Sequence, residues 1–144
     1  MKLWYWQKKI FLKAFFILFI FFNTVNAEIF IIGYAKVSDA DTIKISKYKI
    51  RLHGVDAPEK KQICQKPYLN FGAFSLYKDY LCGEFATNKL KQFIGSEFII
   101  ECKVSDKKDF FGRYLGTCFK NSTNINQWLV ENGYAVAFTK YSKD

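Results

Sequence analysis

Three short segments with β-strand character follow one another at residues 29–37, 41–46 and 48–55, with only very short turns between them. β-Branched and aromatic side chains dominate these segments, and such side chains are favoured in strands. The third segment alternates apolar and polar positions, which sends Ile50 to one face and Arg51 to the other. Strands this close along the chain usually pair with their neighbours, so the sequence predicts a three-stranded meander.

Two helices are predicted further along. Residues 83–94 carry apolar side chains at helical spacing, and Gly95 suits the position just after a helix. A shorter helix is predicted after Asn124, whose side chain can cap it. Gln127 can complete a capping box, and Gly133 ends the helix.

Two more strands are predicted at residues 97–104 and 113–119, joined by the charged loop 105–112. Residues 135–138 form a last extended piece. Residues 60–82 show no clear periodicity and are predicted to be a long, aromatic-rich inserted loop. A loop of this length is expected to be functional or tied down.

This order of elements, mainly β with helices, fits a small, strongly bent five-stranded barrel of the OB type with two packed helices. The pattern leaves an open α+β sheet as the alternative, because a single sequence specifies topology poorly. We expect one domain at residues 28–144, large enough for a small core.

Residues 1–27 form a separate segment. An apolar run at 14–22 follows a positive stretch, and Val25-Asn26-Ala27 resembles a small-residue cleavage site. This is the pattern of a secretory signal peptide. The apolar run is shorter than the roughly 20 residues of a membrane-spanning helix. We therefore expect an exported protein, periplasmic or secreted, with an uncleaved N-terminal membrane anchor as the alternative.

The formal net charge is +9, and +5 remains without the lysines of the leader, which are Lys2, Lys8, Lys9 and Lys13. A moderately basic domain suits a polyanion, because lysine and arginine displace counterions from a phosphate backbone. A lysine-rich surface that only aids solubility is the alternative, so charge alone decides little.

All four cysteines follow the leader, and an even number in a small exported domain predicts two disulfides. Four cysteines allow three connectivities. We favour Cys102–Cys118, because these residues fall on two strands of a predicted hairpin, which leaves Cys64–Cys82 to staple the insertion. A zinc site is a weaker interpretation, since the chain has no CxxC pair and His53 is its single histidine.

Acids gather at the ends of the predicted strands. Asp41 begins the second strand and Asp56 follows the third, so their side chains could meet on a hard cation such as Ca²⁺. Glu59 follows across a proline that stiffens the turn, and could act as a general base toward a water molecule. Such a set suits metal-assisted hydrolysis of a phosphodiester.

Two arginines complete the set. Arg51 lies on the third strand, and Arg113 begins the fifth. Guanidinium groups donate bidentately to phosphate and stay charged at any relevant pH. Donors of this kind, aimed at developing charge, carry much of the catalysis in many enzymes.

Each feature alone has a simpler interpretation. The acids at 39–41 suit a polar turn, Arg51 could be a surface residue paired with Glu59, and Gly112 could mark only a hairpin turn. The order of these residues and their placement at strand ends and turns favour the catalytic interpretation.

The segments VSDADTIKI, IRLHGVDAPE and KDFFGRYLGTCF resemble the thermonuclease (staphylococcal nuclease-like) family. The likeness extends from about Ile32 to Phe138 and is specific, because three separated segments match in order. It implies an OB-fold barrel and an exported bacterial enzyme that cleaves DNA and RNA with calcium and low sequence specificity. The bond to the 5′ oxygen would be cut, leaving 3′-phosphates.

Carried over residue by residue, the resemblance makes Asp41 and Asp56 the calcium carboxylates. The backbone carbonyl of Ala57 becomes a further ligand, so the lack of a polar side chain there costs nothing. Glu59 becomes the general base.

The same resemblance makes Arg51 and Arg113 the groups that hold the phosphate. Asp39 falls on an acid close to the metal, and Asp109 on an acid in the arginine loop, and both are expected to be supporting residues. Phe138 and Tyr141 are candidates for stacking on a nucleotide, with core and chain-end roles as the alternatives. In place of the 60–82 insertion, founding members carry a lysine-rich mobile loop.

A non-catalytic OB-fold module that binds nucleic acid, secreted or membrane-tethered, is the competing hypothesis. Against it, a pure binder has no need for Asp41, Asp56 and Glu59, which would repel phosphate unless a cation intervened. His53, a lone strand histidine, is expected to be structural or a surface residue. We expect nucleic acid as the partner, no stable protein partner, and a monomer.

Overall fold

Five strands close into a barrel in the computed structural model, which describes residues 28–138. The predicted leader at 1–27 and Tyr141 lie outside the described residues. Neighbouring strands pair antiparallel in the order β3-β2-β1-β7-β8, and the parallel pair β3–β8 closes the circle. This confirms the predicted barrel of the OB type. The strands are β1 (Ile29–Asp39), β2 (Thr42–Ile45), β3 (Tyr48–Leu52), β7 (Ile99–Lys108) and β8 (Tyr114–Lys120).

Closure of the barrel depends on Gly116 of β8, which pairs with Leu52 of β3. A Cβ atom at this position would lie 2.8 Å from Val104 Cγ1 and 3.1 Å from Ile50 Cγ2. The first contact is closer than packed atoms allow and the second is tight, so a larger residue here would force the neighbouring side chains or β8 to shift.

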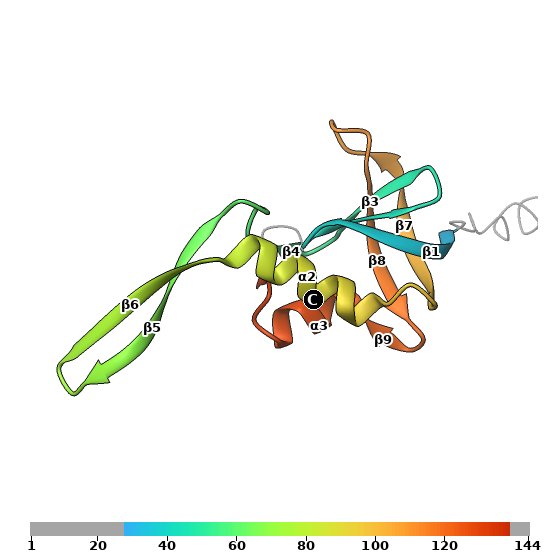
Figure 1. Cartoon of the computed structure of the whole chain (residues 1–144). Helices are drawn as coiled ribbons and strands as arrows, with labels where there is room; N and C mark the ends of the chain where they lie inside the picture. The colour runs from blue at the N-terminus through green and yellow to red at the C-terminus, as the bar shows by residue number, and fades with distance from the viewer. Residues whose placement is uncertain (1–27, 139–144) are drawn as a thin grey trace, which may run out of the picture.

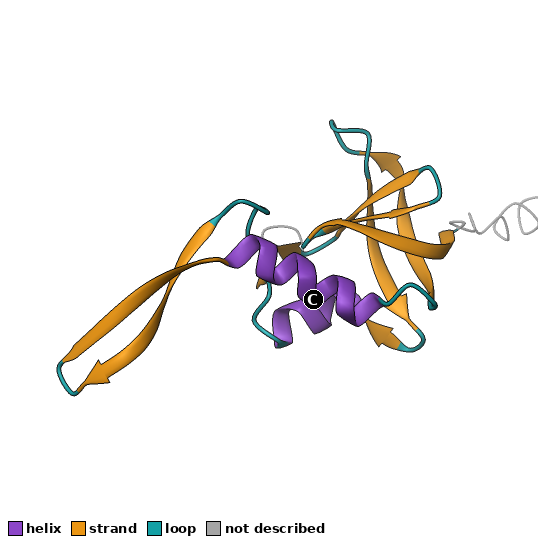
Figure 2. Cartoon of the chain, in the orientation of Figure 1, coloured by secondary structure: helices purple, strands orange, loops and turns teal. Residues whose placement is uncertain are grey.

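Two helices, α2 (Cys82–Ile94) and α3 (Ile125–Glu131), lie side by side against the barrel (Figure 2). The rings of Phe93 and Trp128 stack between them with centroids 3.9 Å apart. Their apolar faces meet the barrel in one core, in which each buried large side chain contributes about 1.5–3 kcal/mol. Its most buried members are Ile43, Ile50, Leu52, Leu90, Ile94, Ile100, Ile125 and Leu129.

The second helix begins as predicted. Asn124 Oδ1 accepts hydrogen bonds from the backbone N–H groups of Asn126 and Gln127, which confirms the cap. The predicted capping box is wrong, because the Gln127 side chain donates to Glu131 one turn later, at 2.6 Å. A carboxylate at that spacing is a charged acceptor within reach on the same face.

Both predicted disulfides are present. Cys102 and Cys118 face each other on β7 and β8 and form a bridge that is fully buried in the core. Cys64 and Cys82 form the other bridge, which joins the insertion to the start of α2.

The predicted third strand is interrupted. β3 ends at Leu52, and a separate short strand, β4 (Val55–Asp56), pairs with β10 (Val136–Ala137). Gly54 has a φ of 73°, a conformation that favours glycine, and it turns the chain between the two strands. The two remaining differences are small: β7 extends into the predicted loop as far as Lys108, and β9 (Thr123–Asn124) precedes α3.

The prediction of a loop at residues 60–82 is wrong. β5 (Ile63–Phe71) and β6 (Phe74–Leu81) form an antiparallel hairpin that stands away from the barrel (Figure 1). Side chains on both faces of this ribbon are mostly exposed. Because neither face is buried, the sequence of the hairpin does not need the alternation of apolar and polar residues that marks a half-buried strand. No helix within residues 28–138 is long and apolar enough to cross a membrane.

Candidate active site

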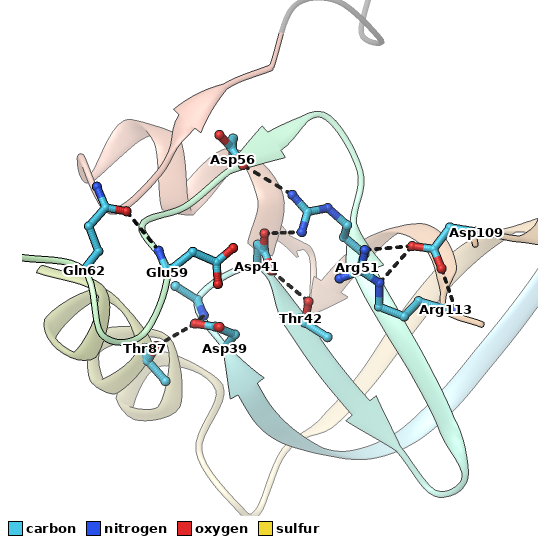
Figure 3. Close-up of polar contacts among 11 residues, drawn as sticks. Asp39, Asp41, Thr42, Arg51, Asp56, Glu59, Gln62, Thr87, Asp109 and Arg113 are labelled. Carbon is cyan, nitrogen blue, oxygen red and sulfur yellow. Dashed lines mark hydrogen bonds and ion pairs between the residues drawn. The ribbon is translucent and has the colours of Figure 1, made fainter. Parts of the chain in front are cut away.

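Arg51 bridges the two acids that were predicted to hold a cation (Figure 3). Its Nη1 lies 2.6 Å from Asp41 Oδ2, and its Nη2 lies 3.3 Å from Asp56 Oδ1. Arg51 is paired with Thr42 across β2 and β3, which brings it beside Asp41. The alternative pairing of Arg51 with Glu59 is therefore wrong, because barrel pairing places the guanidinium between two other carboxylates.

Asp41 is the buried member of this group, with 9% of its side chain exposed. Its Oδ1 accepts from the Thr42 hydroxyl at 2.8 Å, while Oδ2 takes the Arg51 contact. The N–H of Leu52 donates to the Asp41 carbonyl at 2.8 Å and fixes the backbone. A buried carboxylate is costly without partners, and here each oxygen has one.

Asp56 is the exposed member, with 54% of its side chain exposed. Its backbone is held by the β4–β10 pair, in which it faces Val136. Asp56 and Ala57 both line a cleft with Tyr134 on the side of α3.

Asp39 connects the same turn to α2. Its Oδ1 accepts from the backbone N–H of Ala40 at 2.8 Å and lies 3.3 Å from the hydroxyl of buried Thr87. That hydroxyl also lies 2.8 Å from the Gly83 carbonyl. Asp39 therefore helps to position the turn that carries Asp41, in keeping with a supporting role.

Glu59 lies in an exposed turn whose backbone is well fixed. Gln62 N–H donates to the Glu59 carbonyl at 2.7 Å, and Gln62 Oε1 accepts from Glu59 N–H at 3.2 Å. A Cβ atom at Gly83 would lie only 1.7 Å from the Glu59 carbonyl oxygen, so α2 can approach this turn only with glycine there. Figure 3 shows the Glu59 side chain directed toward Asp41.

Arg113 and Asp109 form a second charged unit. Asp109 Oδ2 lies 2.8 Å from both Nε and Nη2 of Arg113, and Oδ1 accepts from the N–H groups of Phe111 and Arg113. Burial by itself raises the pKa of Asp109. The hydrogen bonds and charge of Arg113, with the Phe111 N–H, outweigh burial, and the pKa lies below its usual value. Asp109 thus locks the loop and orients the guanidinium.

One cleft contains both arginines. In the closing pair of the barrel, Arg51 faces Leu115, two residues after Arg113. Phe138 lines the same cleft, held there by its N–H, which donates to the Gly54 carbonyl at 2.9 Å. The full lining is Arg51, Leu52, His53, Gly54, Val55, Asp109, Phe110, Phe111, Arg113, Leu115 and Phe138.

Sequence reasoning missed two aromatic residues of this cleft. Phe110 and Phe111 are 97% and 74% exposed, and the Arg113 guanidinium lies 5.1 Å from the Phe111 ring centroid. A Phe-Phe pair inside a turn is a sequence signal in itself, because nothing local would bury it.

The sequence analysis also did not predict the role of Asn126, a buried side chain that connects α3 to the barrel. Asn126 Oδ1 accepts from the Cys118 N–H at 3.0 Å, and its Nδ2 donates to the carbonyls of His53 and Gly116. Asn126 thereby ties α3 to both closing strands, and His53 is held by its backbone. The one sequence signal for this role is a second asparagine, Asn126, two residues after the capping Asn124.

The donor set fits a hard divalent cation. Asp41 and Asp56 converge on one positive group, and carboxylate oxygens are what such ions prefer. Within residues 28–138, no cluster of three or more His, Cys, Asp or Glu side chains could hold a metal ion. A cation here would take its remaining ligands from backbone carbonyls and water, which calcium and magnesium commonly accept.

A family model described as staphylococcal nuclease homologue matches residues 49–144. This chain belongs to the staphylococcal nuclease homologue family. The predicted resemblance is thereby confirmed, and the matched segment includes Arg51, Asp56, Glu59 and Arg113.

Relatives of this staphylococcal nuclease homologue carry different names. The succinoglycan biosynthesis protein ExoI of Rhizobium meliloti (strain 1021) is 38% identical over 107 residues, covering 74% of this chain and 51% of that protein. The probable staphylococcal-like nuclease CAN3 of Oryza sativa subsp. japonica is 33% identical over 112 residues, covering 77% and 24%. An uncharacterized endonuclease of Escherichia coli O157:H7 is 29% identical over 114 residues, covering 76% and 61%. The chain thus spans about half of the Rhizobium protein and about a quarter of the rice protein.

Proposed function

We propose that this protein is a nuclease that hydrolyses phosphodiester bonds of DNA and RNA with low sequence specificity. The observation that carries the proposal is the single cleft that contains Arg51 and Arg113, with Asp41 and Asp56 both on the Arg51 guanidinium. Family membership supports the same activity, as do relatives whose names include nuclease or endonuclease.

We further propose that calcium is the cofactor. Nucleases of this family are generally metal-dependent. Asp41, Asp56 and the Ala57 carbonyl would hold the ion, which would supply a Lewis acid for a phosphoryl oxygen.

The residues of the chain divide the remaining work. Glu59, in its exposed turn beside the acids, takes a proton from the attacking water. Arg51 and Arg113 donate to the phosphoryl oxygens and stabilise the charge that develops there. The water oxygen bonds to phosphorus while the bond from phosphorus to the 5′ oxygen breaks. The electron pair of that bond goes to the 5′ oxygen, which takes up a proton from solvent, and a 3′-phosphate remains.

Low sequence specificity follows from what lines the cleft. Arginines that contact phosphate position a strand without reading its bases. Phe110, Phe111 and Phe138 add aromatic rings, on which any base can stack. Both features suit DNA and RNA alike.

We also propose that the enzyme acts outside the cytoplasm as a monomer. Export is supported by the leader pattern at 1–27 and by two disulfides, which persist in oxidising compartments. A mature chain that begins at Glu28 would confirm export, and retention of the leader would instead support the membrane anchor. Light scattering of the purified protein tests the monomer.

The decisive experiment is digestion of single-stranded DNA, double-stranded DNA and RNA by purified residues 28–144. Reactions contain calcium, magnesium or excess chelator. We expect cleavage with calcium only, and a loss of about a hundredfold or more in kcat for Glu59→Gln. Glu97→Gln, a matched change in another exposed glutamate, should cut normally.

The outcomes separate the parts of the proposal. Near-normal turnover by Glu59→Gln would remove the base assignment but not the activity. Cleavage with magnesium alone would remove calcium. Binding without cleavage under any metal would replace the nuclease with the non-catalytic OB-fold module.

A further inference from the structure

The β5–β6 hairpin has two chemically different faces. Successive side chains of a strand point to opposite faces, so Phe74, Leu76, Lys78 and Tyr80 of β6 share one face. Their cross-strand partners on β5 lie on that face too. These are Phe71 opposite Phe74, Leu69 opposite Leu76, and Lys66 opposite Lys78. We call these seven residues the stacking face.

The other face carries two polar pairs that satisfy each other, together with Pro67 opposite Tyr77 and Ile63 opposite Leu81. Gln65 Nε2 donates to Asp79 at 3.1 Å, and the Ser75 hydroxyl donates to Asn70 at 2.7 Å. Asp79 is the single acid of residues 60–81, which also contain four lysines. The stacking face is therefore basic and free of acids.

Lys66 and Lys78 are directly opposite each other in the hairpin. Like charges in this position repel and destabilise a strand pair. Within residues 28–138, neither lysine forms an ion pair. An anion held between them, such as a phosphate group, would relieve the repulsion.

The aromatic and apolar side chains beside the lysines are open to solvent. Phe71 and Phe74, near the tip, are 63% and 76% exposed. At the base, the Lys66 ammonium lies 5.2 Å from the Tyr80 ring centroid. The lysine pair thus has aromatic rings on both sides, at the tip and at Tyr80. Proteins hold an unpaired strand with such a combination, because bases stack on rings while lysines meet phosphates.

Ring contacts connect the stacking face to the candidate active site. Tyr80 contacts Phe85 of α2 with centroids 6.2 Å apart, and Phe85 contacts Tyr134 at 6.0 Å. Tyr134 lines the cleft that contains Asp56 and Ala57. Phe85 is itself about half exposed, and Tyr80 and Tyr134 are partly exposed, so solvent reaches each ring of this path.

We propose that the stacking face, together with Phe85, is a second nucleic-acid-binding site that holds an unpaired strand entering or leaving the cleft at Asp56. Nucleic acid as the ligand rests on the proposed function. The site favours single strands, because the bases of a duplex are already paired and stacked on each other. It lies on an element separate from Arg51 and Arg113, and its role is to hold the strand near them.

An anionic membrane surface is the competing partner for exposed rings behind lysines. The structure favours nucleic acid for one reason. A lipid surface would need only the tip, whereas the stacking face runs to the base of the hairpin and continues through Phe85 to Tyr134.

The test is the affinity for a long labelled single strand, measured by fluorescence anisotropy over a range of salt. Excess chelator prevents cleavage. Lys66→Gln/Lys78→Gln should bind more weakly, and the slope of log K against log salt should fall by about 1.4, since each phosphate contact contributes about 0.7. Phe71→Ser/Phe74→Ser should bind about fivefold or more weakly with little change in slope.

A matched control comes from the barrel. Lys36 and Lys44 also face each other across two strands, so Lys36→Gln/Lys44→Gln removes the same charge from the same geometry elsewhere. We expect its affinity and slope to match the wild type. Circular dichroism and thermal midpoints establish that all variants are folded.

Three results would overturn the proposal. The lysine variant could match the wild type. The Phe variant could bind the strand normally but lose sedimentation with anionic vesicles, which would make the tip a lipid site. Finally, the wild type could form a dimer in light scattering that the Phe variant does not form, with strand binding unchanged, which would make the tip a contact between two copies of the chain. The chelator prevents cleavage, so this test measures binding alone. A protein that does not cleave nucleic acid could still bind through the stacking face, and an active nuclease could lack this second site, so the two proposals fail independently.

Discussion

The charged end of the barrel and the β5–β6 hairpin contrast in how they hold their side chains. At the barrel end, each oxygen of buried Asp41 has a partner, and Arg51 lies between two carboxylates. On the hairpin, Phe74 is three-quarters exposed. Lys66 and Lys78 face each other there, and neither forms an ion pair with an acid of residues 28–138. The difference suggests a division of work, since catalysis needs fixed groups and strand binding tolerates adaptable ones.

The physical origin of the contrast is closure. The barrel has every strand paired on both sides around a core that contains the Cys102–Cys118 bridge. The hairpin has two strands, which are marginal alone, and depends on Cys64–Cys82 and the Tyr80–Phe85 contact at its base. Four predictions test this difference between the barrel end and the hairpin.

The largest effect is expected at Arg51. Arg51→Lys keeps the charge, but an ammonium cannot replace the planar fork that reaches two carboxylates and a phosphate. We expect kcat to fall by about a thousandfold in steady-state assays. Lys49→Arg, two residues earlier on β3, is the control and should turn over normally. A loss of only a few-fold would mean that the charge alone matters at Arg51.

The next effect concerns the two disulfides. Cys102→Ala/Cys118→Ala should lower the free energy of unfolding by about 3 kcal/mol, because the bridge constrains a medium loop in the unfolded chain. Cys64→Ala/Cys82→Ala should cost less, since a hairpin without its bridge frays in the folded protein too. Urea denaturation measures both, and limited proteolysis should cut the unbridged hairpin faster. Equal losses would show that the hairpin is as integral to the fold as the barrel.

Gly83 joins the two regions, because it lets α2 approach the turn that carries Glu59. Gly83→Ala places a Cβ atom 1.7 Å from the Glu59 carbonyl oxygen, so the turn must shift. A displacement of this size should lower kcat by about a hundredfold. Gly72→Ala at the hairpin tip is the control, with nothing within 4 Å and a φ of +60°. It should strain the tip and leave turnover unchanged; equal activity of both variants would refute the role given to Gly83.

The smallest effect is a pH dependence at Asp109. Because the pKa of Asp109 is lowered in the folded state, its contribution is complete above the unfolded value of about 3.9. The contribution is lost as the pH falls through the folded-state pKa. Wild type should exceed Asp109→Asn by on the order of 1 kcal/mol at neutral pH, and the two should converge in acid. Denaturation of both proteins across this range measures the difference.

Asp106→Asn, in strand β7 just before Asp109 but without these hydrogen bonds, is the matched control and should show no such convergence. A constant difference between wild type and Asp109→Asn down to the most acid pH would contradict the lowered pKa.

Local patterns explain which parts of the fold could be predicted. The Asn124 cap, the end of α2 before Gly95 and the five barrel strands all depend on neighbours along the chain. The hairpin could not be predicted, because both its faces are exposed and no alternation was required. The break between β3 and β4 at Gly54 could not be predicted either, because apolar and polar residues alternate without interruption through residues 48–54.

The candidate site divides in the same way. The order of acids and arginines and the family could be predicted from the sequence, because they follow from residue types and spacing. Strand pairing within a predicted hairpin favoured one of three cysteine connectivities, and the structure confirms it. Folding of the whole chain is what brings Arg51 between Asp41 and Asp56 and into one cleft with Arg113. Those contacts exist because β3 pairs with β8 when the barrel closes, and the pairing of strands far apart along a chain is set by packing of the whole core.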